Sequence, residues 1–517
     1  MSSTTANNKR IAKNTLLLYF RMLFLMLISL YTSRVILHSL GVTDYGIYNV
    51  VGAFVSMFSI VSSSLTSACS RFFNFEMGKG SNGSNVDRLN VVFSTSLSIQ
   101  FILSLIILIL TESLGVWYIN NVMVLPPGRL IAANWCFQFS VLSFCLCLIT
   151  VPYNASIVAH ERMQAFAYVS IIEGTAKLII AFVIMYNPFD RLVYFALLSF
   201  LLTNFIRFIY QTYCKRTFTE CKYRFIFDKA MLKDMFGYSV WQFVGNTSAI
   251  LKNHGVNILL NLYFGPVVNA ARGVAIQVNN AINHFAGNFM IALTPQITQS
   301  YSAGNLIYSF SLVNRGARFS YYILFIFSLP VIINANYIMH LWLTNVPEYS
   351  VAFVQLILIE MMFTSISRTL ITLQSATGKI RNYQLIVGGI LLLNLPLCYV
   401  MLRLDFSPVI VVLVSLFVEG LAILARMYMI PLTIPEFKPW NYIRSVLLNI
   451  LLVTVLASIL PVALHIIIEE NMVNVMLNIM VSICISSLCI FYIGCSKHER
   501  MVIFGTVDKV KTKILGK

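Results

Sequence analysis

The chain has 517 residues, of which 58% are hydrophobic and only 11% are charged, and its net charge is +17. A soluble protein carries about 25% charged residues, so this composition excludes a water-soluble globular domain. The basic residues lie mainly in the connections expected on one side of a membrane, which is a topology signal, so we expect no nucleic-acid partner.

Apolar stretches recur along the chain, and each is long enough to cross about 30 Å of hydrocarbon as a helix of about 20 residues. The sequence therefore predicts an all-α membrane protein with fourteen transmembrane helices. In chain order the expected spans are residues 14–38, 46–68, 90–111, 130–151, 166–186, 191–213, 236–262, 267–293, 318–339, 350–373, 383–402, 407–430, 443–466 and 473–494.

The distribution of Lys and Arg predicts the orientation. With the N-terminus in the cytoplasm, the expected cytoplasmic connections and tails hold most of the basic residues, among them Lys9, Arg315, Arg318, Arg426 and Lys517. The opposite side holds only Arg34, Arg129, Arg191 and Arg403. The positive-inside rule therefore predicts a multi-pass protein with both termini in the cytoplasm.

The longest expected cytoplasmic connection, residues 214–235, divides the first twelve spans into two sets of six. A weak internal repeat supports this division, because the short turn GVTDYGIY follows the first span and the short turn GPVVNAAR follows the seventh. A parallel repeat of this kind predicts two bundles related by a pseudo-two-fold axis, which suits alternating access. The expected domains are an N-terminal lobe at 1–213, the linker at 214–235, a C-terminal lobe at 236–430, and two extra helices with a basic tail at 431–517.

Motifs of enzymes are missing from the sequence. There is no P-loop, no G-x-G-x-x-G that opens a helix and no H-E-x-x-H, and no connection is long enough for a catalytic domain. The ten Cys lie mostly inside spans and form no C-x-x-C pair. We therefore expect no catalytic residues, no metal, no disulfide and no cofactor other than a coupling ion.

Nine charged residues fall within or close to the expected spans, where each costs about 2.5–3.5 kcal/mol at a helix centre. Such residues usually face a partner or a hydrated cavity. They are Arg21, Arg34, Glu173, Lys177, Lys252, Arg272, Glu360, Arg368 and Glu419. Glu173 and Lys177 are four residues apart and can pair with each other, and Arg34 and Arg368 lie near helix ends, from which they can reach the interface.

The seventh and eighth spans are the least apolar and carry stripes of Asn. Arg272 shares one face of its helix with Asn279 and Asn283, because spacings of seven and eleven residues return within about 20°. On the seventh span Asn253 and Asn257 form a similar stripe. We expect these helices to line a hydrated path, although hydrogen bonds between helices are the alternative.

The predicted substrate-binding residues of the cavity are Arg272, Arg21, Lys252, Asn253, Asn257, Asn279 and Asn283. A structural role stays open for Arg21 and Lys252, because Lys252 lies about 120° from the Asn stripe of its own helix. Glu360 and Glu419 have no cation four residues away and are candidates for coupling to H⁺ or Na⁺. The alternative for both is an ion pair with a cation on another helix.

Three short segments are similar to a known family: LGVTDYG at 40–46, NILLNLYFGPVVNAARG at 257–273 and TPQITQSY at 294–301. They resemble the polysaccharide-exporter branch of the multidrug/oligosaccharidyl-lipid/polysaccharide (MOP) superfamily, which includes the Wzx-type O-antigen flippases. The fourteen-span layout extends this resemblance over the whole chain. The resemblance implies a V-shaped pair of six-helix lobes, a place in the bacterial inner membrane and a lipid-linked oligosaccharide as substrate.

The leading hypothesis is a flippase for an undecaprenyl-diphosphate-linked oligosaccharide, such as an O-antigen unit of lipopolysaccharide or a repeat unit of a capsule or exopolysaccharide. We expect a secondary transporter rather than an enzyme, driven by an ion gradient and working as a monomer. Its expected partners are the lipid-linked oligosaccharide, the membrane lipid and glycan-assembly proteins. Arg suits a diphosphate, because its planar group donates several hydrogen bonds at once.

Two alternatives remain. A cation-coupled multidrug exporter of the same superfamily would favour an acidic or aromatic cavity, whereas basic groups outnumber acidic ones within these spans. A membrane-embedded glycan polymerase or ligase would need a sizeable outer loop, and the longest one expected here is residues 112–129.

Overall fold

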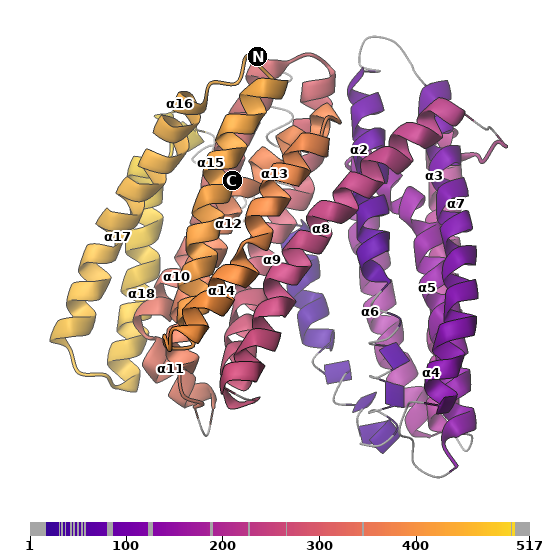
Figure 1. Ribbon diagram of the computed structural model, residues 1–517, viewed down its shortest axis with the longest axis horizontal. Helices are drawn as coiled ribbons and strands as arrows, with labels where there is room; N and C mark the ends of the chain where they lie inside the picture. The colour runs from indigo at the N-terminus through magenta and orange to yellow at the C-terminus, as the bar shows by residue number, and fades with distance from the viewer. Residues whose placement is uncertain are drawn as a thin grey trace, which may run out of the picture. The chain divides into compact units, whose positions relative to one another are not determined.

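The regular elements of the chain are helices. The computed structural model describes residues 17–29, 58–79, 86–121, 128–186, 190–225, 228–264, 266–343, 346–497 and 499–501, together with isolated positions between 31 and 55. Among these residues there is no β-strand, as the apolar runs of the sequence predicted (Figure 1).

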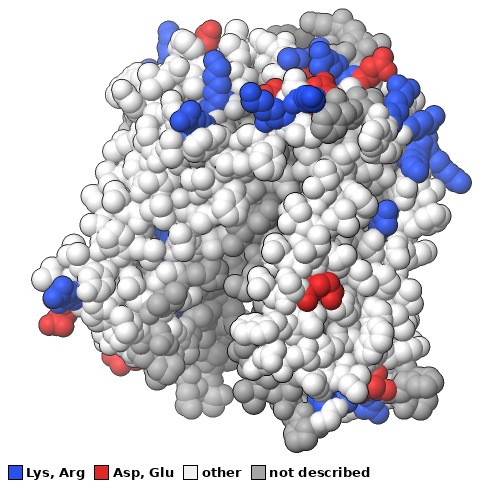
Figure 2. Space-filling view, turned by 45° about the vertical axis from the view of Figure 1, so that its right-hand side comes forward, with Lys and Arg blue, Asp and Glu red and all other residues white. Residues whose placement is uncertain are grey.

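Ten of the described helical segments are long and apolar enough to cross a membrane. They are Val86–Asn121, Leu130–Ala159, Met163–Met185, Arg191–Thr217, Leu306–Ile333, Ser350–Thr377, Arg381–Arg403, Ile410–Thr433, Pro439–Ile467 and Met472–Gly494. On the face drawn in Figure 2, Lys and Arg gather mainly at one end, next to a broad band with few charged side chains. These observations indicate a multi-pass membrane protein.

The other four expected spans are the more polar ones or lie in partly described regions. Helices α8 (Lys229–Phe264) and α9 (Pro266–Ser302) run through the expected seventh and eighth spans. The helix Leu17–Ser29 and α2 (Ser59–Lys79) lie at the first two. Arg34 lies outside the described residues.

The chain divides into two compact units. Unit 1 comprises residues 1–247 and 291–305, and unit 2 comprises residues 248–290 and 306–517. The division thus falls inside α8 and α9, rather than in the connection at 214–235. That connection belongs to unit 1 because Asn90 holds it, donating hydrogen bonds to the backbone oxygens of Glu220 and Lys222 over 2.8 and 2.7 Å.

Unit 1 is built around one long helix, α5 (Leu130–Ala159), which packs against neighbouring helices on three sides. Phe137 and Val141 of this helix are fully buried and form a core with Ile47 and Val51. The described helices of unit 1 are Leu17–Ser29, α2, α3 (Val86–Leu110), α4 (Val116–Asn121), the central α5 (Leu130–Ala159), α6 (Met163–Met185), α7 (Arg191–Thr217), the first part of α8 and the last part of α9.

One arginine ties together the turns at one end of unit 1. Arg129 forms ion pairs with Asp44, which belongs to the GVTDYGIY turn, and with Asp190 at 2.6 Å. Asp190 also caps α7, because its Oδ1 accepts a hydrogen bond from the backbone nitrogen of Leu192 at 3.1 Å. Asp44 of the GVTDYGIY turn is therefore paired with Arg129.

Unit 2 contains the second part of α8, the first part of α9 up to Met290, and the remaining helices. Its central helix, α12 (Ser350–Thr377), packs against α10 (Leu306–Ile333) and α15 (Ile410–Thr433). Helix α12 ends at Gly378, whose φ of 75° suits glycine. The remaining helices are α10 (Leu306–Ile333), α11 (Ala335–Trp342), the central α12 (Ser350–Thr377), α13 (Arg381–Leu392), α14 (Asn394–Arg403), α15 (Ile410–Thr433), α16 (Pro439–Tyr442), α17 (Leu448–Ile467) and α18 (Met472–Cys489).

Several expected boundaries were wrong. The third span continues as a helix to Asn121, which shortens the outer loop expected at 112–129. The expected span 383–402 is divided at Leu393, because Pro396 has no N–H to continue the hydrogen-bond ladder. Helix α10 begins at Leu306, so Arg315 and Arg318 lie inside it instead of in a cytoplasmic connection.

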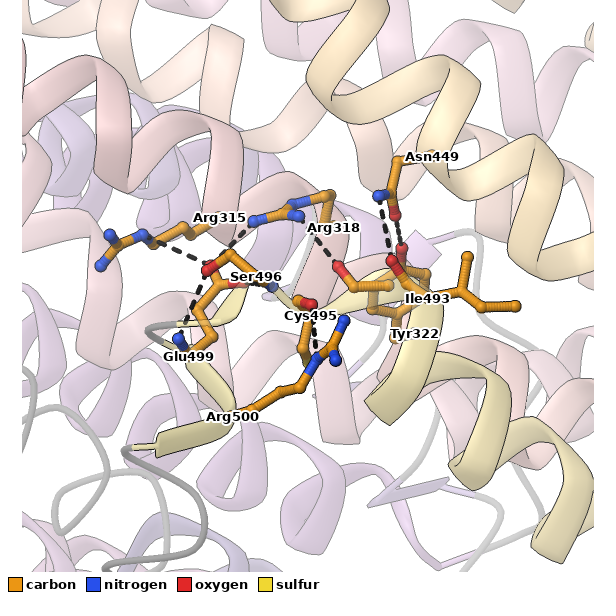
Figure 3. A network of polar contacts seen from close by, with 10 residues as sticks. Arg315, Arg318, Tyr322, Asn449, Ile493, Cys495, Ser496, Glu499 and Arg500 are labelled. Atoms are coloured by element: carbon orange, nitrogen blue, oxygen red, sulfur yellow. Dashed lines mark hydrogen bonds and ion pairs between the residues drawn. The ribbon is translucent and has the colours of Figure 1, made fainter.

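The segment after α18 explains why two arginines are tolerated in α10. Glu499 is buried and accepts hydrogen bonds from Nη2 of Arg318 at 2.7 Å and from the backbone nitrogen of Ser496 at 2.7 Å (Figure 3). Nε of Arg315 lies 3.4 Å from the same carboxylate. Arg500 donates to the backbone oxygen of Tyr492 at 2.6 Å. These contacts anchor the end of the last helix pair to α10.

Candidate functional site

The charged side chains expected inside the membrane in the second half of the chain come together in unit 2. They lie on four helices, α8, α9, α12 and α15, each of which keeps its helical hydrogen bonds through the site. Helix α9 begins at Pro266, whose fixed φ and missing N–H are tolerated in a first helical turn. The charged groups therefore project from regular helices rather than from loops.

Lys252 of α8 joins two carboxylates. Its Nζ donates a hydrogen bond to Oε1 of Glu360 at 2.8 Å and lies 3.7 Å from Oε2 of Glu419. The Lys252 side chain is 9% exposed, that of Glu360 19% and that of Glu419 3%. Helices α8, α12 and α15 are thus linked by one shared ammonium group.

A fourth charge, Arg426, completes this cluster and was not predicted to lie there. Its Nη1 donates to Oε1 of Glu419 at 2.9 Å and to Oγ of Ser367 at 3.0 Å, and its Nε donates to the hydroxyl of Tyr383 at 3.2 Å. From the sequence we counted Arg426 with the cytoplasmic loops. That placement was wrong, because the residue lies within α15 and is only 4% exposed.

The sequence contained a signal for the pair of Glu419 and Arg426. Glu419 and Arg426 are seven residues apart, and seven residues return an α-helix to within about 20° of the same face. A search restricted to a spacing of four residues misses it. Ser367 and Tyr383 carried no comparable signal, because neither residue type is unusual in a membrane helix.

The charges in this cluster balance. Lys252 and Arg426 supply two positive charges, and Glu360 and Glu419 supply two negative ones. Each buried ion would be costly alone, and the pairing together with the added hydrogen bonds offsets that cost. The two carboxylates proposed as ion-coupling groups are therefore both paired with cations on the neighbouring side chains, as the alternative hypothesis allowed.

Arg272 of α9 has a different environment. It is 8% exposed, and its Nη1 donates a hydrogen bond to Oδ1 of Asn257 on α8. Its Nε has no hydrogen-bond partner among the described residues, and the same holds for Oδ1 of Asn279, two turns further along α9. In the described part of the chain no carboxylate lies within 4.0 Å of this guanidinium.

A second guanidinium repeats this arrangement further along the helices. Nη2 of Arg368 on α12 donates to Oδ1 of Asn283 on α9 at 2.7 Å. Again no described carboxylate pairs with the arginine. Asn283 lies eleven residues after Arg272, which corresponds to about 16 Å along the helix axis.

The polar contacts therefore link three helices pairwise at successive depths. Arg272 joins α9 to α8, Lys252 joins α8 to α12, and Arg368 joins α12 to α9. We call these three residues the basic column. Its three cations and Arg426 have only two carboxylate partners among the described residues, Glu360 and Glu419, so the column together with its partners carries more positive than negative charge.

Other predicted site residues lie elsewhere. Arg21 belongs to unit 1, where its Nη1 donates to Oγ of Ser170 at 3.4 Å and its guanidinium lies 4.6 Å from the ring centre of Phe166. Glu173 and Lys177 pair with each other at 2.6 Å, as their spacing predicted. The side chain of Asn253 lies outside those that the structure describes.

Metal binding has no support in the described side chains. Among them, no group of three or more His, Cys, Asp or Glu residues is placed to hold a metal ion. The basic column instead provides charged groups that donate hydrogen bonds within a bundle of membrane-spanning helices.

The fold is that of MATE transporters of the MOP superfamily. A multidrug resistance MATE family transporter in an outward-facing conformation superposes with a TM-score of 0.70 at 13% identity, over 84% of this chain and 97% of that one. The MATE transporter ClbM in complex with Rb⁺ gives 0.66 at 14% identity, over 84% and 96%.

A third solved structure has the same fold. It is a MOP superfamily transporter from Pyrococcus furiosus whose binding pocket has reverse polarity, and it gives a TM-score of 0.68 at 13% identity, over 82% and 96% of the two chains. No family model matches the sequence, and no curated protein matches it. At these identities the likeness concerns the fold.

A double-mutant cycle tests the pairing of Lys252 with Glu360. Lys252→Met should lower the free energy of unfolding by about 3 kcal/mol, because it leaves the carboxylate of Glu360 without its cation. Adding Glu360→Gln should recover part of the loss, with a coupling energy of about 1–3 kcal/mol. The measurement is denaturant unfolding in detergent, with Lys379→Met on an exposed turn as the control. Additive effects of the two substitutions would contradict the pair.

Proposed function

We propose that the chain is a secondary transporter that flips an undecaprenyl-diphosphate-linked oligosaccharide across the bacterial inner membrane. The observation that carries this proposal is a pair of arginines, the buried Arg272 and the half-buried Arg368, that bond to asparagines and to no described carboxylate. Such arginines are costly in a membrane unless an anion uses them. A diphosphate is an anion that arginine binds through several donors.

The geometry favours movement of an anionic group along the helices. The basic column places donors at successive depths, so that a diphosphate leaving one could meet the next. The asparagines beside it, Asn257, Asn279 and Asn283, have amide groups that suit sugar hydroxyls. The lipid chain of such a substrate would remain in hydrocarbon, and no catalytic group is required.

The acidic residues provide a way to couple transport to an ion gradient. We infer that Glu360 carries the coupling, because it is the more exposed of the two carboxylates, whereas Glu419 is held by Arg426 as well. A proton or Na⁺ on Glu360 would release the ammonium of Lys252 to the substrate. Loss of that ion would restore the pair and expel the anion.

Export of cationic drugs is the second candidate. The likeness to multidrug resistance MATE transporters favours it. The charge of the site opposes it, because a cation would meet the two uncompensated arginines. The Pyrococcus furiosus transporter, whose pocket polarity is reversed, has the same fold, and this supports the inference that the fold alone does not determine the cargo.

Substitution of Arg272 tests the cargo. Arg272→Ala should lower translocation of lipid-linked oligosaccharide in proteoliposomes by about ten- to a hundredfold, because it removes a charge-assisted donor. Arg272→Lys should retain intermediate activity, since it keeps the charge and loses the planar donor set. Arg403→Ala, on the exposed end of α14, is the matched control. A normal rate for Arg272→Ala, or export of cationic dyes in place of the lipid, would contradict the flippase.

Substitution of Glu360 tests coupling separately. Glu360→Gln keeps the size of the side chain and removes its charge, so translocation should continue without acceleration by a proton or sodium gradient. Glu348→Gln, in the exposed turn before α12, should leave the acceleration unchanged. A full response of Glu360→Gln to both gradients would assign Glu360 a purely structural role.

A further inference from the structure

Unit 1 has a feature that the proposed transport mechanism does not use, an apolar groove lined by residues of α2, α3 and the first part of α8. Its volume is about 380 Å³, within the range of about 300–1,000 Å³ that small-molecule sites occupy. Its lining is apolar apart from Ser64 and Ser239. All the residues that line it belong to unit 1.

Part of the lining of the groove comes from a helix that is long and apolar enough to cross a membrane. Ile102 and Ile106 line it from α3, within the candidate span Val86–Asn121, and Phe236 and Val240 line it from α8. These side chains are exposed, Ile102 by 52% and Phe236 by 58%. A recess with this lining would stay dry, so its occupant must be a hydrocarbon chain.

The end of the groove is basic. Along α8 the residues Lys229, Lys233, Phe236, Val240 and Phe243 follow one another at spacings of three or four, so the two lysines begin the helical face that lines the groove. Both lysines are exposed, and neither takes part in an ion pair with any residue that the structure describes.

The acidic groups nearby are directed to other partners. Asp228 caps α8 by accepting from the backbone nitrogens of Ala230 and Met231 at 2.9 and 3.0 Å. Asp87 lies 3.6 Å from Arg224. Asp234 follows Lys233 directly and therefore projects about 100° away from it around the helix. The two lysines are thus the charged residues of α8 that share the helical face of Phe236, Val240 and Phe243.

We propose that the groove is a binding site for an anionic phospholipid of the bilayer, with an acyl chain between α3 and α8 and its phosphate at Lys229 and Lys233. Lysine ammonium groups at a membrane surface attract anionic head groups. The bilayer supplies this lipid directly, because the groove is open to it. The site is separate from the basic column of unit 2 and does not depend on which cargo the transporter moves.

Photo-labelling in nanodiscs tests the proposal with phosphatidylglycerol and phosphatidylethanolamine that carry a diazirine on the acyl chain. Phosphatidylglycerol should label residues 99–106 and 236–243 about tenfold more than phosphatidylethanolamine. Lys229→Gln with Lys233→Gln should remove this preference. Lys215→Gln with Arg216→Gln, at the end of α7, should preserve it as the matched control.

Filling the groove provides a second, independent variant. Val240→Trp should abolish labelling from both lipids at residues 99–106 while both lysines remain. Equal labelling by the two lipids in the unsubstituted protein, or a preference that survives the double lysine substitution, would overturn the proposal. Displacement of the bound label by undecaprenyl diphosphate but not by excess phosphatidylglycerol would also overturn it, since the groove would then belong to the substrate.

Discussion

The ion pairs of Lys252 are the constraint on which unit 2 depends. A single ammonium group in hydrocarbon is costly, and so is each carboxylate beside it, but one lysine shared between two glutamates leaves a charge that Arg426 can neutralise. The four residues come from three helices, α8, α12 and α15. Their relative positions are therefore determined by charge as well as by apolar packing.

This requirement has consequences for the remaining polar residues. Because the carboxylates are already shared by Lys252 and Arg426, Arg272 and Arg368 obtain only neutral partners, Asn257 and Asn283. An arginine bonded to a neutral amide keeps most of its attraction for an anion, whereas an arginine in a tight ion pair does not. The cluster thus leaves two guanidiniums with no carboxylate partner among the described residues, and the proposed anionic cargo rests on this feature.

Sequence patterns were sufficient where a partner lies on the same helix or an apolar run is long. The ten apolar spans were found in this way, and so was the Glu173–Lys177 pair, because spacing along one helix is visible in the sequence. That the Asn-rich helices α8 and α9 line a hydrated path stays a prediction. The start of α10 at Leu306 and the division at Leu393 were missed, since polar residues hide the extension of a helix and a continuous apolar run hides a proline break.

Contacts between helices were beyond the reach of the sequence. Nothing in the spacing of Lys252 and Glu360 shows that they meet, because 108 residues separate them. Arg426 was misplaced for a related reason. Its position near the end of an apolar run is typical of an interfacial residue, and only the buried Glu419 beside it explains why it lies inside the bundle.

The most direct test of the account is a density map of the protein reconstituted with undecaprenyl-diphosphate-linked oligosaccharide. The account predicts density for the diphosphate within hydrogen-bond distance of Arg272 or Arg368, with the sugars against the asparagines of α8 and α9. Diphosphate density remote from both arginines, at a protein shown to translocate the lipid, would contradict the assignment of these side chains as the anion-binding site.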